Sequence, residues 1–318
     1  RKIAIGKTIT RGLGAGMNPE VGARAAEENG NEIREALSGA DMVFLTCGLG
    51  GGTGTGAIPE VAKLAKDIGA LTVAVVTKPF TFEGAQRRRI ADEGFDRLLQ
   101  HVDAIITIPN DRVLQIIDKK TSLMDAFTVV DDVLRQGVQG IAELITVPGL
   151  INVDYADVKA IMENSGSALM GIGRASGENR AVEAAKQAIA SPLLELSIDG
   201  AKGILFTIAG GSDLGMHEVA EAAKVITSSA DEDAKVIFGA NLNEEMEEEI
   251  RITVVATGFD SRERRTTAPG SVEVQAQGTW SPNSFLRVRE EEPARTQTTK
   301  PKPKVNFQAP VAQERREV

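Results

Sequence analysis

The residues best suited to chemistry lie in a glycine-rich segment with the sequence CGLGGGTGTGAIPE, residues 47–60. Glycine adopts positive φ at little cost and leaves room for an anion to approach the backbone. The segment precedes a predicted helix, whose free N–H groups and positive dipole end attract negative charge. The combination predicts a phosphate-binding loop, in which the two threonines can add hydroxyl donors. Its members are Gly50, Gly51, Gly52, Thr53, Gly54, Thr55 and Gly56.

Two common phosphate-binding patterns fit this segment poorly. A P-loop needs a glycine five residues before Gly-Lys-Thr, but Arg1 occupies that position for the GKT near the start of the chain. No lysine follows the glycine-rich segment either. The dinucleotide fingerprint has one loose match, at Gly52, Gly54 and Ala57. The next predicted strand ends at Lys78 without the acidic residue that would hold a ribose, so this alternative is weak.

The elements around the loop alternate between strands and helices. Continuous apolar runs at 41–47, 70–77 and 103–109 are typical of buried parallel strands. Helices are predicted from Asn18, as cap, to about residue 37, from 57 to 67, and between the second and third strands. This order predicts an α/β fold, a Rossmann-like parallel sheet with helices on both faces.

A long amphipathic helix follows, with apolar residues three and four positions apart over residues 122–146. At about 1.5 Å per residue it would span nearly 40 Å. Its glycines, Gly137 and Gly140, are tolerable if another backbone packs closely against them. Further helices near 155–163, 180–190 and 216–228 and strands near 203–209, 235–240 and 250–257 predict a second, smaller α/β domain. The long helix would therefore join two domains.

Composition excludes several classes of protein. The chain has 318 residues and a net charge of −9, and no apolar run approaches the length of a membrane span. A single cysteine, Cys47, allows no internal disulfide, and two histidines leave little scope for a zinc centre. Residues 261–318 carry a net charge of +4 and half of the 12 prolines, which predicts a disordered linker. The acidic remainder argues against nucleic acid as a partner.

Several segments together resemble one family. GGGTGTG at 50–56 resembles the signature of the tubulin/FtsZ superfamily. Supporting segments are GLGAGMNPEVG at 12–22, VAVVTKPFTFEG at 73–84, ITIPND at 106–111 and NVDYADVK at 152–159. In this order they resemble the FtsZ family of bacterial division GTPases over residues 1–260. The resemblance implies GTP and GDP as bound nucleotides, a GTP-binding domain at 1–121, a spine helix at 122–147, an activating domain at 148–260 and a tail at 261–318.

The resemblance also implies roles for residues outside the phosphate loop. A second loop near the γ-phosphate matches Gly14, Ala15 and Gly16, which alone would be an ordinary turn. Glu83 and Arg87 match residues that hold the ribose and phosphates, and they are also spaced for a surface salt bridge. The guanine pocket matches Asn110, Phe127 and Asp131, although Phe127 also fits the apolar stripe of the long helix as a core residue. A carboxylate can accept from guanine N1–H and N2–H₂.

The catalytic residues implied by the family are Asn152, Asp154 and Asp157, in a loop that acts on the nucleotide of the next subunit. Asp154 is also placed to cap the helix that follows. The two carboxylates would position and polarise the water that attacks the γ-phosphate. Because carboxylates repel a triphosphate, Mg²⁺ is expected on the nucleotide rather than in a cage of protein side chains. Subunits would then stack head to tail, a heterologous contact that builds filaments.

The chain departs from the family pattern at both ends. It begins with Arg1, so we expect a fragment that lacks the first strand, glycine loop and helix of the family. The short C-terminal peptide that binds membrane tethers is not evident in the final residues, QERREV. With those expectations, the sequence predicts a cytoplasmic GTPase that polymerises at the mid-cell division site and recruits tethering and regulatory proteins, without inserting into the membrane.

Three alternatives stay open from the sequence alone. The first is a tubulin-like scaffold that binds nucleotide without turning it over. The second is a Rossmann oxidoreductase that binds NAD(P), and the third is an adaptor that binds neither nucleotide. Cys47 and the two histidines are given no functional role.

Overall fold

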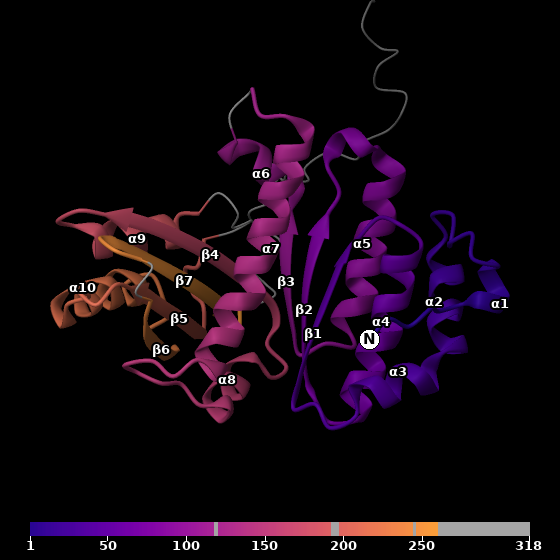
Figure 1. Cartoon of the computed structure of the whole chain (residues 1–318), viewed down its shortest axis with the longest axis horizontal. Coiled ribbons are helices and arrows are strands. Elements are labelled where there is room, and N and C mark those ends of the chain that lie inside the picture. Colours follow the sequence, from indigo (N-terminus) through magenta and orange to yellow (C-terminus); the bar gives the residue numbers. More distant parts are fainter. Residues whose placement is uncertain (118–119, 192–196, 244–245, 260–318) are drawn as a thin grey trace, which may run out of the picture. The chain divides into compact units, whose positions relative to one another are not determined.

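The computed structural model describes residues 1–117, 120–191, 197–243 and 246–259, so the predicted linker at 261–318 lies outside the described part. Seven strands form one sheet in the order β1-β2-β3-β4-β7-β5-β6 (Figure 1). Their bounds are β1 Met42–Gly48, β2 Leu71–Lys78, β3 Ala104–Pro109, β4 Gly166–Ser176, β5 Gly203–Gly210, β6 Lys235–Leu242 and β7 Glu249–Thr257. The α/β class with a mostly parallel sheet is confirmed.

The first half of the chain contributes the helices that cover one face of strands β1–β3 and a short helix that directly follows β3. They are α1 Lys7–Thr10, α2 Pro19–Glu28, α3 Gly30–Leu37, α4 Thr53–Asp67, α5 Ala85–Leu99 and α6 Asn110–Ile116, with a 3₁₀ turn, η1, at Thr81–Glu83. The second half contributes α7 Leu123–Thr146, α8 Tyr155–Met162, α9 Arg180–Ile189 and α10 Met216–Thr227.

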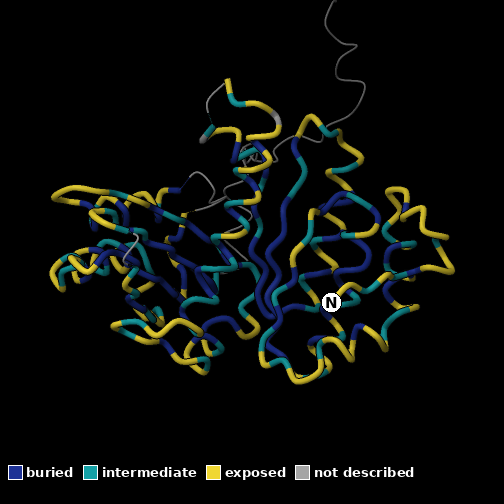
Figure 2. The backbone as a smooth tube through the Cα atoms, viewed as in Figure 1, coloured by how far each residue is buried: buried dark blue, intermediate teal, exposed yellow. Residues whose placement is uncertain are grey.

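Alternation along β2 shows how the two faces are covered. Val73 and Val75 belong to a core that includes residues of α7 and α8, whereas Ala74 and Val76 belong to a core with α4 and α5. Successive side chains of a strand point to opposite faces, so a strand buried on both faces reads as a continuous apolar run. The strands accordingly form the buried centre of the molecule, and exposure increases toward the outer helices (Figure 2).

Strand β4 connects the two halves of the sheet, and it was not predicted from the sequence. Gly166–Ala168 pair in parallel with Ala104–Ile106 of β3, and the rest of β4 runs antiparallel to β7. The sequence of β4 is not typical of a strand, because Gly171 and Gly173 lack the side chains with which a strand normally packs. Their bareness lets α9 approach, since a Cβ on either glycine would lie 1.9 Å from a carbonyl oxygen of α9.

Three further details correct the predicted elements. The helix expected from Asn18 to about residue 37 breaks at Asn29, whose side-chain oxygen instead accepts the backbone N–H of Gly6 at 3.0 Å. The first strand is only partly buried, with Thr46 exposed. In α7, Gly137 and Gly140 face the side chains of Met170 and Thr253 rather than another backbone.

Candidate functional site

The carboxyl ends of β1, β2 and β3 meet at one edge of the sheet, because the three strands are parallel. The loops that leave this edge contain the glycine-rich segment after β1, η1 after β2 and Asn110 directly after β3. The start of α7 lies beside α6 at the same end of the molecule (Figure 1). Open α/β sheets bind ligands outside the carboxyl ends of their strands.

The glycine-rich loop is held from below by its own threonine. Thr55 is buried, and its hydroxyl oxygen accepts the backbone N–H of Gly50 at 2.9 Å. Leu49 N–H donates to the carbonyl of Thr77 at 2.9 Å, which ties the loop to β2. Thr55 therefore fixes the shape of the loop, while Thr53 stands exposed at the start of α4 and is free to meet a ligand.

The glycines of the loop serve two different purposes. A Cβ on Gly56 would lie 1.9 Å from the carbonyl oxygen of Pro19, and one on Gly52 would lie 2.8 Å from the backbone nitrogen of Asn18. These two glycines allow α4 to pack closely against the start of α2. A Cβ on Gly51, by contrast, would meet no atom within 4 Å, and its φ is not positive. Gly51 thus borders the open side of the loop, where an anion could approach the backbone.

The second predicted loop lies against the first. Gly14 and Gly16 have φ of 80° and 58°, and a Cβ on either would meet nothing within 4 Å. Ala15 between them is buried, and its Cβ would lie 2.8 Å from a Cβ placed on Gly52. The structure therefore brings the two glycine loops side by side with bare backbone exposed, and successive backbone N–H groups suit phosphate oxygens.

Glu83 and Arg87 form the salt bridge that their spacing suggested. Glu83 also accepts the backbone N–H of Phe80 at 2.9 Å, which fixes η1. The pair nevertheless stands next to the phosphate loop, because a Cβ on Gly50 would lie 3.0 Å from the carbonyl oxygen of Arg87. About two fifths of the Arg87 side chain is exposed, so its guanidinium remains accessible.

The predicted base pocket has an aromatic and a polar side. Phe127 is 45% exposed and is not a core residue; its ring makes an edge contact with Phe80, with centroids 5.8 Å apart. Phe80 in turn stacks on Phe82 at 4.9 Å. Asn110 is buried, and its Oδ1 has no hydrogen-bond partner, which is costly unless a ligand supplies one. Asp131 is exposed one turn after Phe127.

The residues gathered at this edge of the sheet are suited to bind a nucleotide. The two glycine loops leave backbone bare where phosphates would lie, and Asn110 offers an orphaned polar atom to a base or ribose. Phe82 was not predicted as a site residue, although it is 67% exposed and stacks on Phe80 within this aromatic group. The motif TKPFTFEG contained the signal, since a phenylalanine in a tight turn after a parallel strand lies at the ligand-binding edge of the sheet.

The predicted catalytic residues lie elsewhere. Asp154 caps α8, and its carboxylate accepts the backbone N–H of Asp157 at 2.9 Å. Asn152 accepts the N–H of Gly149 at 2.7 Å, and all three predicted catalytic side chains are on exposed residues. Figure 1 shows α8 beside the far end of α7 from α6. Because α7 has 24 residues, it is about 36 Å long at about 1.5 Å per residue, so Phe127 near its start and Asn152 just beyond its end belong to opposite ends of this helix.

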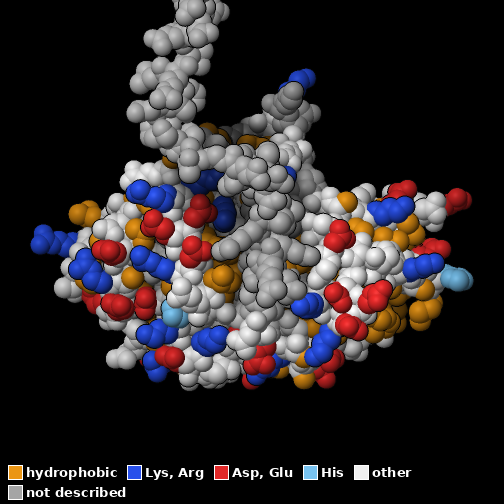
Figure 3. Space-filling view, turned by 180° about the vertical axis from the view of Figure 1, so that it is seen from behind, with side chains coloured by type: hydrophobic (Ala, Val, Ile, Leu, Met, Phe, Trp, Pro, Cys, Tyr) orange, Lys and Arg blue, Asp and Glu red, His pale blue; other side chains and the backbone are white. Residues whose placement is uncertain are grey.

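The other features that we considered as reactive or binding sites show no sign of such a role among the described residues. Burial raises the pKa of the Cys47 thiol to about 12, so it stays protonated and inert at neutral pH. Acidic and basic side chains are intermixed over the face shown in Figure 3. Within the described ranges, no helix is long and apolar enough to cross a bilayer, and no three His, Cys, Asp or Glu side chains cluster to hold a metal.

Comparisons with known proteins agree with this architecture. The model of the tubulin/FtsZ family GTPase domain matches residues 1–118, and that of the FtsZ family C-terminal domain matches residues 166–260. A dimeric, empty FtsZ from M. jannaschii is 51% identical, with a TM-score of 0.78, and the match covers 81% of this chain and 75% of that one. A point mutant of the same protein gives the same identity and TM-score, with coverage of 81% and 77%.

More distant structures share the fold. CetZ1 from Haloferax volcanii, bound to GDP, is 22% identical with a TM-score of 0.68, over 82% of this chain and 79% of that one. The matches define a tubulin-like GTPase domain with its companion C-terminal domain. With half of its aligned residues identical to an FtsZ, this chain belongs to the FtsZ family. GTP and GDP binding and GTP hydrolysis are properties of that family.

Proposed function

We propose that this chain binds GTP, polymerises head to tail and hydrolyses GTP at sites shared by successive subunits. The observation that carries the proposal is that the two groups of residues lie at opposite ends of α7 (Figure 1). The aromatic group lies at the start of α7, and Asp154 and Asp157 follow the other end of this helix, which is about 36 Å long. No single chain could close such a site, whereas a stacked neighbour could.

Exposed apolar side chains at both ends support stacking. Phe82, Met124 and Phe127 are exposed around the start of α7, and Val147 and Leu150 are exposed beyond its end. Apolar surface at a protein interface stabilises association when water is removed from it. A CetZ2 from Haloferax volcanii, 21% identical with a TM-score of 0.68 over 83% of this chain and 80% of that one, forms a protofilament with GTPγS bound. The FtsZ from M. jannaschii is a dimer.

In the proposed site, each chain contributes different parts. Gly50–Gly56 and Gly14–Gly16 hold the phosphates through backbone N–H groups, with Arg87 beside them. Asn110, Phe127 and Asp131 hold the ribose and guanine. Bound Mg²⁺ would neutralise charge on the β- and γ-phosphates.

Asp157 of the next chain orients a water toward the γ-phosphorus and accepts its proton. The new P–O bond forms as the bond to the GDP oxygen breaks, which yields GDP and phosphate. Asp154 holds the start of α8 while its free oxygen polarises the same water. Asn152 shapes the loop that leads to both.

Membership of the FtsZ family also supports a cellular role and a division of the chain into functional parts. We infer division at mid-cell as the process, the cytoplasm as the location and tethering or regulatory proteins as further partners. Residues 1–121, 122–147, 148–260 and 261–318 would act as the GTP-binding domain, spine, activating domain and linker. The continuous sheet across β3 and β4 joins the first and third of these more closely than separate domains would be joined.

Turnover at different protein concentrations tests the proposal. At saturating GTP, the rate per chain should rise with concentration, because each site needs a neighbour. A rate per chain that is constant from dilute to concentrated protein would contradict a shared site. Nucleotide binding without any turnover would favour the scaffold instead, and binding of NAD(P) in place of GTP would favour the oxidoreductase.

A further inference from the structure

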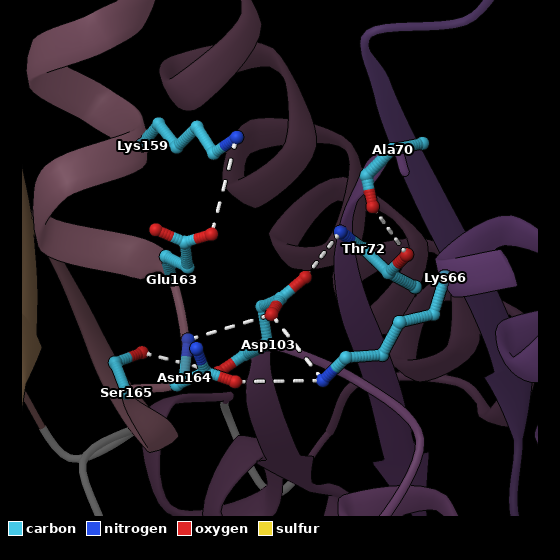
Figure 4. Close-up of polar contacts among 8 residues, drawn as sticks. All are labelled: Lys66, Ala70, Thr72, Asp103, Lys159, Glu163, Asn164 and Ser165. Atoms are coloured by element: carbon cyan, nitrogen blue, oxygen red, sulfur yellow. Dashed lines mark hydrogen bonds and ion pairs between the residues drawn. The ribbon is translucent and has the colours of Figure 1, made fainter. Parts of the chain in front are cut away.

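The helix that carries the proposed catalytic acids is fastened at its far end to the first half of the sheet. A buried carboxylate, Asp103, lies just before β3 and is 5% exposed. Its Oδ2 accepts the backbone N–H of Thr72 at 2.9 Å, and its Oδ1 accepts the N–H of Asn164 at 3.4 Å. Lys66 at the end of α4 places its Nζ 3.5 Å from the same Oδ1 (Figure 4). One side chain therefore joins β2, α4 and the residues that follow α8.

The main chain strengthens this junction. The carbonyl of Asp103 accepts the N–H of Gly166 at 2.9 Å and the hydroxyl of Ser165 at 3.5 Å. Asn164 has a left-handed φ of 51°, and its side-chain oxygen lies 3.5 Å from Lys66 Nζ. A carboxylate buried this deeply needs its partners, because an unpaired buried charge is strongly destabilising. The turn from α8 into β4 is thus fixed by charge as well as by packing.

The start of α8 has its own attachment to the same half of the sheet. The hydroxyl of Tyr155 donates to the carbonyl oxygen of Asp41 at 2.6 Å, and Leu71 N–H donates to that same oxygen at 2.9 Å. The helix between the two attachments has 8 residues, or about 12 Å. A helix this short moves as one body, so a shift at Asn164 also moves Asp157.

We propose that Asp103 is a positioning residue for GTP hydrolysis, which acts through Asn164 and Lys66 to set where α8 presents its acids to the neighbouring subunit. This inference rests on the proposed function, because it assumes that the α8 acids act on the neighbour's nucleotide. Reacting groups tolerate little displacement, and an error of about 1 Å can cost about a hundredfold in rate. The residue would affect turnover but not the nucleotide pocket of its own chain.

Replacing Asp103 with asparagine in the full chain tests the proposal. Asparagine keeps an acceptor for Thr72 N–H but loses the charge that faces Lys66. We expect kcat at saturating GTP to fall about tenfold or more, while GDP affinity, binding stoichiometry and pelleting with GTP stay within about twofold of wild type. Lys66→Met removes the cation that faces the buried carboxylate of Asp103, so it should lower kcat in the same direction and should also lower the melting temperature.

Two matched variants separate positioning from general destabilisation. Glu163→Gln alters a surface ion pair with Lys159 in the same connection and should leave kcat unchanged. Asp213→Asn removes a partner of buried Arg180, remote from α8, and should lower the melting temperature without lowering kcat per nucleotide-binding chain. The proposal is wrong if Asp103→Asn keeps wild-type kcat, or if its kcat falls only in proportion to the lost nucleotide-binding chains.

Asp157→Ala in the same assay shows whether a negative result concerns only the role of Asp103 or the shared catalytic site itself. If Asp157→Ala loses turnover while Asp103→Asn retains it, only the positioning role is overturned. If Asp157→Ala itself retains turnover, the proposed function fails first.

Discussion

Two glycines of the phosphate loop should respond to the same substitution in opposite ways. In Gly56→Ala, the new Cβ would lie 1.9 Å from the carbonyl oxygen of Pro19 and 2.8 Å from the nitrogen of Ala23, where ordinary contacts begin at 3.4 Å. Both obstacles are backbone of α2, so the helix itself must move. Overpacking of this kind costs about 1–3 kcal/mol, and each kcal/mol lowers the melting temperature of a domain of this size by about 2–4 °C.

Gly51→Ala places its methyl group in open space instead. No atom lies within 4 Å of that position, so the melting temperature of the nucleotide-free chain should be unchanged or slightly raised. The methyl group would, however, stand between the backbone and the phosphates. We expect GDP affinity to fall about tenfold, equivalent to about 1.4 kcal/mol.

Thermal unfolding and titration with a fluorescent GDP analogue measure the two effects separately. The expected pattern is a lower melting temperature for Gly56→Ala and weaker binding with normal stability for Gly51→Ala. Wild-type GDP affinity in Gly51→Ala would refute the assignment of this loop to the phosphates. Wild-type stability in Gly56→Ala would refute the reason given for that glycine.

Three other predictions concern the carboxylates of Asp154, Asp131 and Glu218. Asp154→Ser should keep the N-cap and the melting temperature but lose turnover, whereas Asp154→Ala should lose turnover and also about 1 kcal/mol of stability. Steady-state GTPase rates and thermal unfolding measure both effects. Normal turnover in the serine variant would mean that Asp154 only caps α8. Asp131→Asn should weaken GTP binding about tenfold or more and improve XTP binding, because an amide N–H can donate to the 2-oxo group of xanthine. Competition between GTP and XTP measures this change. An unchanged preference for GTP over XTP would show that Asp131 does not contact the base. Hydrogen bonds from Arg180, and then from Gly215 N–H, lower the pKa of Glu218 below its usual 4.5, so its contribution to stability is present above that pH and is lost as the pH falls below it. Glu218→Gln should therefore flatten the acid decline of the melting temperature, and an equally steep decline would contradict this.

Much of the architecture could be predicted because local patterns and tertiary burial agree. The apolar runs of β2 and β3 are buried on both faces, and α7 begins at the serine cap and ends at the residue that periodicity indicated. The strand β4 was not predicted, because Gly171 and Gly173 allow the close approach of α9, through contacts with Ala188 and Ala184 that are 17 and 11 residues away in the sequence. Such glycines lower strand propensity locally and make sense only in the packed structure.

The site divides in the same way. The glycine spacing predicted a phosphate loop, but it could not show that Thr55 is buried beneath it or that only Gly51 borders open space. The stripe of α7 suggested that Phe127 could be core, yet it is 45% exposed and meets the buried ring of Phe80 edge to face. Asp103 gave no signal at all, since its role depends on three segments that meet only after folding.

Mixing two inactive chains tests the shared site most directly. One chain would carry Asp157→Ala, which keeps its nucleotide pocket, and the other would carry Gly51→Ala with Asp131→Asn, which keeps its α8 acids. A site that spans two subunits predicts that each chain alone hydrolyses little GTP and that the mixture recovers turnover. If both chains pellet together with GTP and the mixture remains inactive, the acids of one subunit do not serve the nucleotide of the next.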